Sequence, residues 1–529
     1  MNPAPEPASG AEARRALQAA ATQRLHPLSW LFILLLQLRN FALPILVLLV
    51  SGRGEQSPAE LIGLAGAGVL VVVAVWHYFT YRYGFVGRAL VIRSGLLERN
   101  LRLIPFDRVQ NVTLHQNLLH RLAGVAELRL ESAGGVGETE ARMQVLPLAQ
   151  AHALEALVRG EAPGGDPVTA AATAEEAAVA RPERWLQLPT SELVRLGLIS
   201  NRGMLVVAAA LGLLSQTGDA GMQRVSSEIE QLGRDSLALA EGWQPGPLAW
   251  ALAGLALLLA LFTLLRLLSV ALAVLQFHDF QLWAGERELR IERGLLSRLR
   301  SHLPKRRIQA YSLRESLLHR WFGRQSLRID RASIETQGDT PSMRDLVPLA
   351  TPARMTAILD RLLPSEAWPP RAWQPLHPRA WWRVFAPPAL GVLAGTAVVA
   401  AWHGPEAVWA LLLLPLLALR ARLWARYTGW SLAQGVFTFR QGWLDRRWRF
   451  VETAKIHAVS LHENPFDRRH DMAALRIDTQ GASPLEPALF VPYLPAAEAR
   501  ALAEALRAAL PRDPGISRAR TAESAAPAG

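Results

Sequence analysis

The chain has no cysteine, and only two of its 57 basic residues are lysines, Lys305 and Lys455. The absence of cysteine excludes a disulfide framework and thiolate chemistry, and it fits a protein that faces a reducing cytoplasm. Charged residues are also scarce, at 19% of the chain against roughly 25% in typical soluble proteins. Hydrophobic residues make up 50% of the chain, so the composition predicts a membrane protein.

The sequence also lacks the motifs that mark several enzyme classes. It has no Gly-rich phosphate loop, no nucleophile motif and no familiar metal-ligand spacing. The segment "HENPFDRRHD" at 462–471 holds two His and two Asp, but their spacing matches no common metal site. We therefore expect no catalytic residue, no metal and no cofactor. The apolar blocks described next also exclude a soluble nucleic-acid-binding protein.

Hydrophobic residues are concentrated in six blocks. Most of them approach or exceed the roughly 20 residues that a helix needs to cross a bilayer. The shortest blocks, 203–215 and 407–419, are the weakest candidates. The blocks come in three pairs, which predicts six transmembrane helices in three hairpins: 27–50 with 61–81, 203–215 with 247–277, and 384–402 with 407–419.

The distribution of arginine predicts the orientation of these helices. Few basic residues lie inside the pairs, whereas Arg82 and Arg88 follow the first pair and Arg420, Arg422 and Arg426 follow the last. The positive-inside rule therefore places both termini and all long polar segments in the cytoplasm. We expect a multi-pass protein of the bacterial cytoplasmic (inner) membrane.

One segment occurs three times along the chain without gaps. It reads "IRSGLLERNLRLIPFDRVQNVTLHQNLLHRL" from Ile92, "IERGLLSRLRSHLPKRRIQAYSLRESLLHRW" from Ile291 and "FRQGWLDRRWRFVETAKIHAVSLHENPFDRR" from Phe439. Each copy directly follows one hydrophobic pair. The repeated unit is therefore two membrane helices followed by a domain of roughly 80 residues.

Each copy predicts a small antiparallel β domain. "ALVIRSG" and "NLRLIP" alternate with the two-residue period of a half-buried strand, and Gly95 marks the reversal between them. "NLLHRLAG" interrupts this pattern with a helical turn, and an amphipathic helix follows at 148–158. We expect an α+β membrane protein with three partly open, β-barrel-like domains, each closed by a C-terminal helix.

The predicted organisation along the chain follows from these patterns. It comprises a disordered cytoplasmic tail (1–26), hairpin 1 (27–81), domain 1 (82–158), a linker (159–187), hairpin 2 (188–277), domain 2 (278–363), a linker (364–377), hairpin 3 (378–426), domain 3 (427–510) and a disordered tail (511–529).

The repeated segment resembles a known family. A strand, then Gly-Leu-Leu-x-Arg, a Pro, a basic-hydrophobic-Gln triplet and Leu-Leu-His-Arg-x-x-Gly is similar to the bacterial pleckstrin-homology-like (PH-like) domain of the membrane-bound YdbT group. The resemblance implies a membrane-anchored interaction module without catalytic residues. The third copy departs from the pattern, because Leu118-Leu119-His120 becomes Pro465-Phe466-Asp467, and Asp471 replaces the Gly found at 124 and 323.

His120 and His319 raise the question of a duplicated catalytic pair. The third copy has Asp467 at this position, and no nucleophile or carboxylate recurs at a fixed spacing beside the histidines. A structural role is favoured, in which Leu119, Leu318 and Phe466 plug the open end of each barrel. The neighbouring Arg121, Arg320 and Arg468 would then bond to backbone carbonyls or face lipid headgroups.

Basic residues that recur in the copies are the candidates for contact with lipid or a protein partner. The densest cluster is "LPKRRIQ" at 303–309, and an anionic headgroup contributes about 1 kcal/mol per contacting charge. The alternative is a solvated strand face with cross-strand charge pairs. The candidates are Arg108, Arg121, Lys305, Arg306, Arg307, Arg320, Lys455 and Arg468.

Two arginines lie midway along predicted membrane blocks, Arg39 in 27–50 and Arg266 in 247–277. A central arginine costs roughly 2.5–3.5 kcal/mol on insertion scales, so such residues are expected to be functional, to be paired or to reach the interface. "SNR" at 200–202 lies at nearly the same distance from its preceding Pro as "LRN" at 38–40. This recurrence favours a structural device over a transport site.

Together these patterns favour a non-enzymatic scaffold that presents three cytoplasmic PH-like domains to a protein partner, to anionic lipid headgroups or to both. The alternative is a small transporter or lipid-handling protein whose repeated hairpins line a path. The sequence does not identify the partner, and it leaves open whether the three domains pack together.

Overall fold

The computed structural model describes most of the chain. The described residues are 22–35, 59–95, 100–132, 141–159, 182–216, 246–331, 344–364, 367–479 and 489–509, with a few isolated positions between these ranges. They form two compact units that divide at Pro304 and Lys305, and each unit is taken by itself below. Most of the predicted span 27–50, including Arg39, lies outside the described residues, as does the predicted tail at 511–529.

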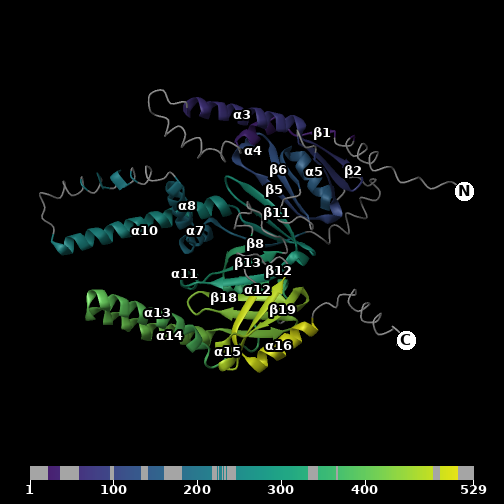
Figure 1. Ribbon diagram of the computed structural model, residues 1–529. Helices are drawn as coiled ribbons and strands as arrows, with labels where there is room; N and C mark the ends of the chain where they lie inside the picture. The colour runs from purple at the N-terminus through teal and green to yellow at the C-terminus, as the bar shows by residue number, and fades with distance from the viewer. Residues whose placement is uncertain are drawn as a thin grey trace, which may run out of the picture. The chain divides into compact units, whose positions relative to one another are not determined.

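The first unit contains two antiparallel sheets (Figure 1). The four-stranded sheet has the order β1 (Gln23–Arg24), β2 (Arg82–Val86), β3 (Ala89–Ser94) and β4 (Asn100–Pro105). The first seven-stranded sheet has the order β7 (Ala141–Pro147), β6 (Val125–Ser132), β5 (Val109–Gln116), β11 (Arg298–Pro304), β10 (Glu288–Arg293), β9 (Gln281–Ala284) and β8 (Glu183–Gln187).

The second unit repeats this plan with one sheet of seven strands and one of three. The second seven-stranded sheet has the order β14 (Asp345–Ala350), β13 (Gln325–Arg331), β12 (Ile308–Glu315), β18 (Arg446–Glu452), β17 (Val436–Gln441), β16 (Gly429–Ala433) and β15 (Gln374–Pro375). The three-stranded sheet has the order β19 (Ile456–His462), β20 (Met472–Thr479) and β21 (Leu489–Pro495).

The seven-stranded sheets each combine strands of two consecutive repeats. In the first, β5–β7 of repeat 1 join β8–β11 of repeat 2, and in the second, β12–β14 of repeat 2 join β15–β18 of repeat 3. The sequence predicted a separate barrel-like domain for each repeat, and the structure shows shared sheets instead. The physical reason is the open edge of β5 and β12, whose unpaired backbone groups are satisfied by the next repeat.

The glycine shared by all three copies has a clear role in the turns before β11 and β18. Gly294 and Gly442 have φ angles of +110° and +81°, which side chains with a Cβ rarely adopt. A Cβ on Gly294 would lie 1.9 Å from the Ser297 carbonyl oxygen, and one on Gly442 would lie 2.2 Å from that of Asp445. Only glycine fits these turns.

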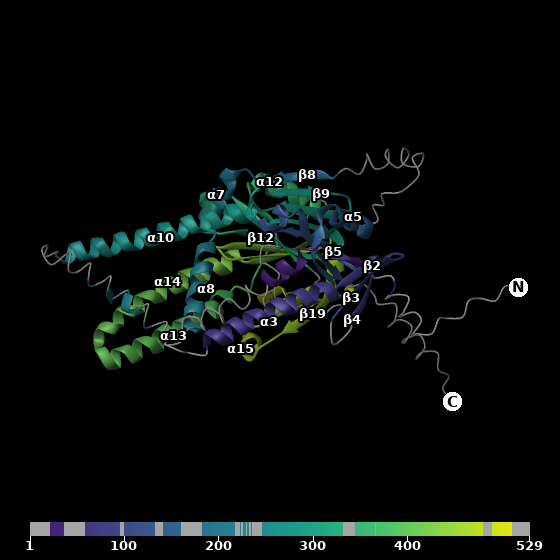
Figure 2. The same ribbon diagram turned by 90° about the horizontal axis from the view of Figure 1, so that it is seen from above.

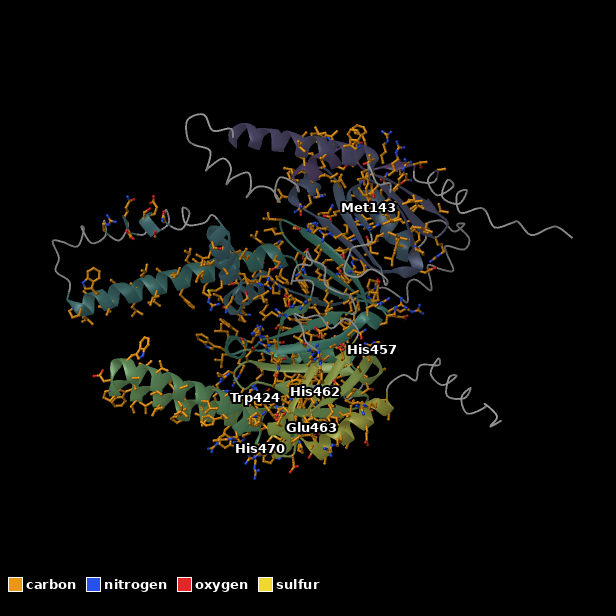
Figure 3. The ribbon with its side chains drawn as sticks, in the orientation of Figure 1. Met143, Trp424, His457, His462, Glu463 and His470 are labelled. Atoms are coloured by element: carbon orange, nitrogen blue, oxygen red, sulfur yellow. The ribbon has the colours of Figure 1, made fainter. Side chains whose placement is uncertain are left out.

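Each unit has its own hydrophobic core. In the first, Tyr83, Leu90 and Leu128 are buried between the four-stranded sheet, β5–β7 and helix α5 (Leu148–Arg159), together with Met143 of β7 (Figure 3). In the second, a core of the same kind lies between β17, β18, the three-stranded sheet and helix α16 (Ala496–Ala508). Trp424, labelled in Figure 3, packs against this second core.

In each repeat, apolar helices lie in the chain between the first strand (β1, β8 or β15) and the strands that follow. They are α3 (Ala59–Thr80), α7 (Thr190–Ile199), α8 (Arg202–Gln216), α10 (Pro247–Phe277), α13 (Ala380–His403) and α14 (Leu413–Tyr427), which continues the 3-10 helix η4 (Pro405–Leu412). In the second unit, α13 and α14 lie side by side and extend away from the strands in both views (Figures 1 and 2).

Among the described residues, three helices are long and apolar enough to cross a membrane: Pro247–Phe277, Ala380–Trp402 and Pro405–Tyr427. A fourth is obtained if α7 and α8, which are bent by 55° at their junction, count as one span. Three or four of the six predicted spans are therefore supported by length and composition.

Short elements complete each repeat. A single strand, β1, β8 or β15, precedes each hairpin and pairs at the edge of a sheet, although the sequence assigned these residues to the first tail and the two linkers. The short helices are α4 (Leu118–Leu122), α11 (Leu317–Trp321) and α15 (Pro465–Arg469), the 3-10 turns are η1 (Phe106–Arg108), η2 (Lys305–Arg307) and η5 (Thr453–Lys455), and α12 (Pro352–Leu362) is the C-terminal helix of repeat 2.

Candidate functional site

The Leu-Leu-His-Arg segments form the short helices α4 and α11, and their third relative forms α15. The residue that each helix buries is the histidine or its replacement, since His120, His319 and Asp467 are all buried. Leu119 and Phe466 are instead half or more exposed. The prediction that these side chains plug the end of a barrel is therefore wrong, because a five-residue helix on a sheet edge buries only its one inward position.

The buried position contacts the start of the predicted hairpin of its own repeat. In repeat 1, the ring of His120 lies 4.2 Å from the ring of Phe32, centroid to centroid, at an angle of 39°. In repeat 3, Nη2 of Arg383 on α13 lies 3.1 Å from Oδ1 of Asp467. Phe32 and Arg383 are equivalent, since each lies five residues after a proline, Pro27 or Pro378. An aromatic contact in one repeat is thus an ion pair in another.

His319 is held as a neutral structural residue. Its Nδ1 lies 2.8 Å from Oγ of Ser316, the residue that caps α11. Burial, with a smaller contribution from the charge of Arg314, lowers the pKa of His319 to about 4. The imidazole therefore carries no charge near neutral pH, and its hydrogen bond is used locally. This arrangement supports a structural role over a catalytic one.

The arginine that follows the histidine connects one repeat to the next. Nη1 of Arg121 donates to the carbonyl oxygen of Leu295 at 2.9 Å, and Nη1 of Arg320 donates to that of Trp443 at 3.4 Å. Each acceptor directly follows the turn glycine of the next repeat, Gly294 or Gly442. Arg468 of α15 is exposed, and its guanidinium makes no hydrogen bond or ion pair with the described residues.

Each of the three short helices exposes at least one large apolar side chain. Leu122 is 79% exposed, Trp321 82% and Phe466 65%. We call these surfaces the apolar tips and define them as Leu118, Leu119 and Leu122 of α4, Leu317 and Trp321 of α11, and Phe466 of α15. In repeats 1 and 3, the buried residue of the same helix contacts the start of the predicted hairpin, at Phe32 and Arg383. Each of these tips therefore lies where its domain meets its helix.

The sequence contained a signal for the apolar tips that the plug interpretation missed. Two leucines precede the histidine in repeats 1 and 2, and an apolar residue, Leu122 or Trp321, follows the arginine. In a five-residue helix these positions surround the buried histidine, so they can only face outward.

The predicted basic cluster of repeat 2 lies on the turn η2. Arg306 is exposed, while Lys305 and Arg307 are half-buried. Burial and the neighbouring charge of Arg306 lower the pKa of Arg307. At the equivalent turn of repeat 3, Nζ of Lys455 lies 2.6 Å from Oε1 of Glu452, which is a local charge pair three residues apart and not the cross-strand pair of the alternative interpretation. The side chain of Arg108 lies outside the described residues.

Arg266 is bound by the break between two helices. Its Nη1 donates to the carbonyl oxygens of Leu198 at 3.0 Å and Ser200 at 3.2 Å, and to Oδ1 of Asn201 at 3.1 Å. Helix α7 ends at Ile199, so two of these acceptors are carbonyls that a helix terminus leaves without intrahelical partners. Its guanidinium also lies 4.9 Å from the ring centroid of Phe262. Arg266 thus stabilises a bend.

The described residues hold no group of three or more His, Asp or Glu side chains that fits a metal ion. A cleft of about 670 Å³ lies between β15, β16 and α16, lined by both apolar residues and Arg371, Gln374, Ser431 and Glu498. The cleft gathers one basic and one acidic side chain, and no histidine lines it that could activate Ser431. We therefore regard this cleft as a groove in the surface.

Comparison with known proteins identifies the repeat. A family model described as "Bacterial PH domain" matches the chain three times, over residues 32–162, 235–363 and 388–510. The chain is also 23% identical over 317 residues to the UPF0699 transmembrane protein YdbT of Bacillus subtilis (strain 168), a match that covers 57% of this chain and 61% of that protein. The chain thus spans less than two thirds of the length of this curated relative. No solved structure matches.

Proposed function

Because the chain belongs to the bacterial PH domain family, which matches it over more than half of its length, we propose that it is a membrane-anchored, non-enzymatic scaffold. It would hold three PH domains against the surface of the bacterial cytoplasmic membrane, where they contact anionic lipid headgroups and bind a protein partner. The three repeated PH domains and the apolar helices make it a multi-pass membrane protein. What we propose is the role of these domains at the membrane surface.

The apolar tips carry the proposal. Leucine and tryptophan side chains exposed to water are unfavourable, but the same side chains are stable at the boundary between headgroups and acyl chains. The short helix of repeat 3 also carries Arg468, whose long stem lets Phe466 enter the boundary while the charge stays with the headgroups. A headgroup contact contributes about 1 kcal/mol per charge.

A non-enzymatic role is supported by how the repeated polar residues are used. His319 bonds to the cap of its own helix, Asp467 pairs with Arg383, and Arg121 and Arg320 bond to turn carbonyls. These contacts satisfy the groups that looked most reactive in the sequence. A transporter draws no support from Arg266, because three acceptors at the α7–α8 break already bind its side chain.

The contact with lipid is tested by single cysteines placed in this cysteine-free chain. The full-length protein, reconstituted in bilayers, carries a fluorescent probe at Leu122→Cys, Trp321→Cys or Phe466→Cys. A matched control is His457→Cys, an exposed position at the far end of β19 from α15, roughly 20 Å away along the strand (Figure 3). We expect quenchers attached to lipid near the headgroups to quench the three tip probes and to leave the His457→Cys probe unaffected.

The role of charge is tested in the same bilayers with and without anionic lipid. We expect Arg468→Gln to reduce quenching of the Phe466→Cys probe in anionic bilayers and to have no effect in neutral ones. Tip probes that water-soluble quenchers reach as easily as the control probe would refute the proposed membrane contact. The anchoring by the apolar helices would remain, and the domains would then face a partner in solution.

A further inference from the structure

The two strand pairs that join consecutive repeats have the same register. In the first seven-stranded sheet, Leu299 of β11 lies opposite His115 of β5, and in the second, Arg447 of β18 lies opposite Arg314 of β12. The gap-free alignment of the copies makes Leu299 equivalent to Arg447 and His115 equivalent to Arg314. The chain therefore makes one antiparallel pairing twice, and we refer to the two as the β5–β11 junction and the β12–β18 junction.

The three repeats contain the strands for a third pairing that the described residues do not make. Strand β4 is the counterpart of β11 and β18, and β19 is the counterpart of β5 and β12. Among the described strands, β4 pairs only with β3, and β19 pairs only with β20. Each strand thus has one neighbour where its counterparts have two.

Side chains that are buried at the junctions are exposed on these two strands. Leu103 of β4 is 48% exposed, whereas its counterparts His302 and Phe450 are 4% and 0% exposed. On β19, Ala458 is exposed, whereas its counterparts Asn111 and Ala310 are buried. The missing neighbour accounts for both differences.

We propose that β19 of one copy of this protein pairs with β4 of a second copy, in the register that the two junctions already use. The register sets Asn100 opposite His462, Leu101 opposite Leu461, Arg102 opposite Ser460 and Leu103 opposite Val459. A strand edge with unpaired backbone groups is a template for another strand, and here each chain carries one edge of each kind.

The occupant is a second copy because the chain itself provides both halves of a geometry that it makes twice internally. The two edges differ from one another, so their pairing is head-to-tail and continues as a row or closes as a ring. Membrane anchoring favours this association, since it confines all copies to one plane. The proposal does not depend on the lipid contacts of the apolar tips.

The test uses two single-cysteine variants of the full-length protein, each with its own affinity tag, coexpressed in native membranes. One chain carries Arg102→Cys and the other carries Ser460→Cys. Neither chain can form an intramolecular disulfide, so a covalent product with both tags requires two copies. We expect this mixed dimer under mild oxidation, and we expect the same from the second in-register pair, Asn100→Cys with His462→Cys, whose positions are exposed.

Two controls make the result specific. Arg102→Cys with His457→Cys is displaced by three residues, about 10 Å along the strand, and a disulfide does not form when the two Cα atoms are more than about 7 Å apart. Thr113→Cys with Ser301→Cys in a single chain occupies the equivalent positions of the β5–β11 junction, so its intrachain disulfide shows that this register is competent.

The outcomes distinguish a second copy of this protein from any other partner of the β4 and β19 edges. The mixed dimer from both in-register pairs, with none from the displaced pair, supports the proposal. Absence of the mixed dimer while the Thr113–Ser301 disulfide forms overturns it. Equal yields from in-register and displaced pairs, dimers of one variant with itself, or a product with a protein of different mass overturn it as well.

Discussion

At the β5–β11 junction, Nε2 of His115 lies 2.7 Å from Oγ of Ser297, a contact between an imidazole and a hydroxyl. At the equivalent positions of the β12–β18 junction, Nε and Nη2 of Arg314 lie 2.9 Å and 3.1 Å from the two carboxylate oxygens of Asp445. The interiors differ as well. His302 of β11 is buried with its Nε2 2.7 Å from Oε1 of Glu155, whereas its counterpart Phe450 is buried among apolar side chains.

The difference shows which features of a junction are required. Backbone register and the donation from Arg121 or Arg320 to a turn carbonyl are common to both, while a histidine–serine contact becomes an arginine–aspartate pair and a buried histidine becomes a phenylalanine. Backbone pairing therefore defines the junction, and the side chains only need to satisfy one another. The edges of β4 and β19 that pair with no described strand therefore correspond to both junctions by position and not by residue type.

The largest expected effect removes a buried side chain from the β12–β18 junction. Phe450→Ala should lower the local free energy of unfolding by about 3–5 kcal/mol, because it leaves a cavity in a close-packed site. Its matched control is Leu103→Ala on β4, at the same repeat position but half exposed, with an expected loss below about 1 kcal/mol. Hydrogen-exchange mass spectrometry of the β18 and β4 amides measures both. Equal losses would contradict the distinction between junction and end strands.

A somewhat smaller effect is expected at the base of α13, where repeat 3 differs from repeat 1. Asp467→Ala should cost about 2–3 kcal/mol, because it leaves the largely buried Arg383 without its carboxylate. The double variant Arg383→Phe with Asp467→His installs the pair found at Phe32 and His120, and we expect it to recover most of the loss. Thermal unfolding in detergent compares the single and double variants. Failure of the double variant to recover stability would show that the two contacts are not interchangeable.

The next effect depends on pH and belongs to His319, beside the β12–β18 junction. Its folded-state pKa of about 4 is below the usual 6.5, so the unfolded chain binds more protons between these values. The stability is therefore complete above pH 6.5 and falls as the pH decreases toward 4, by about 2 kcal/mol at pH 5. Unfolding followed from pH 7 to pH 5 measures this slope. His319→Asn should reduce it, and an unchanged slope would exclude His319 as its source.

The smallest effect compares the polar contacts of the two junctions directly. Arg314 and Asp445 are each more than a third exposed, so we expect Arg314→Ala to cost less than about 1 kcal/mol. That cost should shrink as salt is added, because solvent-exposed charges are screened. Ser297→Ala at the β5–β11 junction removes an uncharged hydroxyl, so its loss should depend less on salt. A salt-independent loss for Arg314→Ala would mean that packing, not charge, accounts for its contribution.

The sequence predicted the repeats, the strand-rich domains and three or four of the six apolar spans, because the copies align without gaps and strand alternation is local. It did not predict the shared sheets, since the alternation in "VQNVTLHQ" shows that Val112 and Leu114 face a core but not which strand lies beside them. Strand β15 is two residues long and is separated from its partner β16 by a whole hairpin, so no local pattern marks it.

The sequence predicted only part of the candidate site, because it does not show how each short helix is oriented on its sheet. The carbonyl contacts of Arg121 and Arg320 matched one of the two alternatives drawn from the sequence. The apolar tips were missed because exposure in a five-residue helix depends on how the helix sits on its sheet, and Leu119 and His120 look equally suited to a buried position until that is known. The orientation, and not the composition, determines which of the two is buried.

The short strands that precede the hairpins have a consequence for membrane topology. A hydrogen-bonded sheet cannot have strands on opposite sides of a bilayer, so β1 and β2 lie on one side, as do β8 with β9 and β15 with β16. The chain between the members of each pair must cross the membrane an even number of times. Repeat 3 meets this condition with the spans Ala380–Trp402 and Pro405–Tyr427.

In repeat 2, the same condition of an even number of crossings bears on the bent helix pair α7 and α8. If Pro247–Phe277 crosses the bilayer, a second crossing between β8 and β9 is required, and the bent pair Thr190–Ile199 and Arg202–Gly212 is the segment among the described residues that can supply it. The three acceptors that bind Arg266 lie at this bend. Because Arg266 is on α10, it would hold the bent pair against that helix. The pairing of β8 with β9, strands of five and four residues, therefore requires an even number of membrane crossings between them.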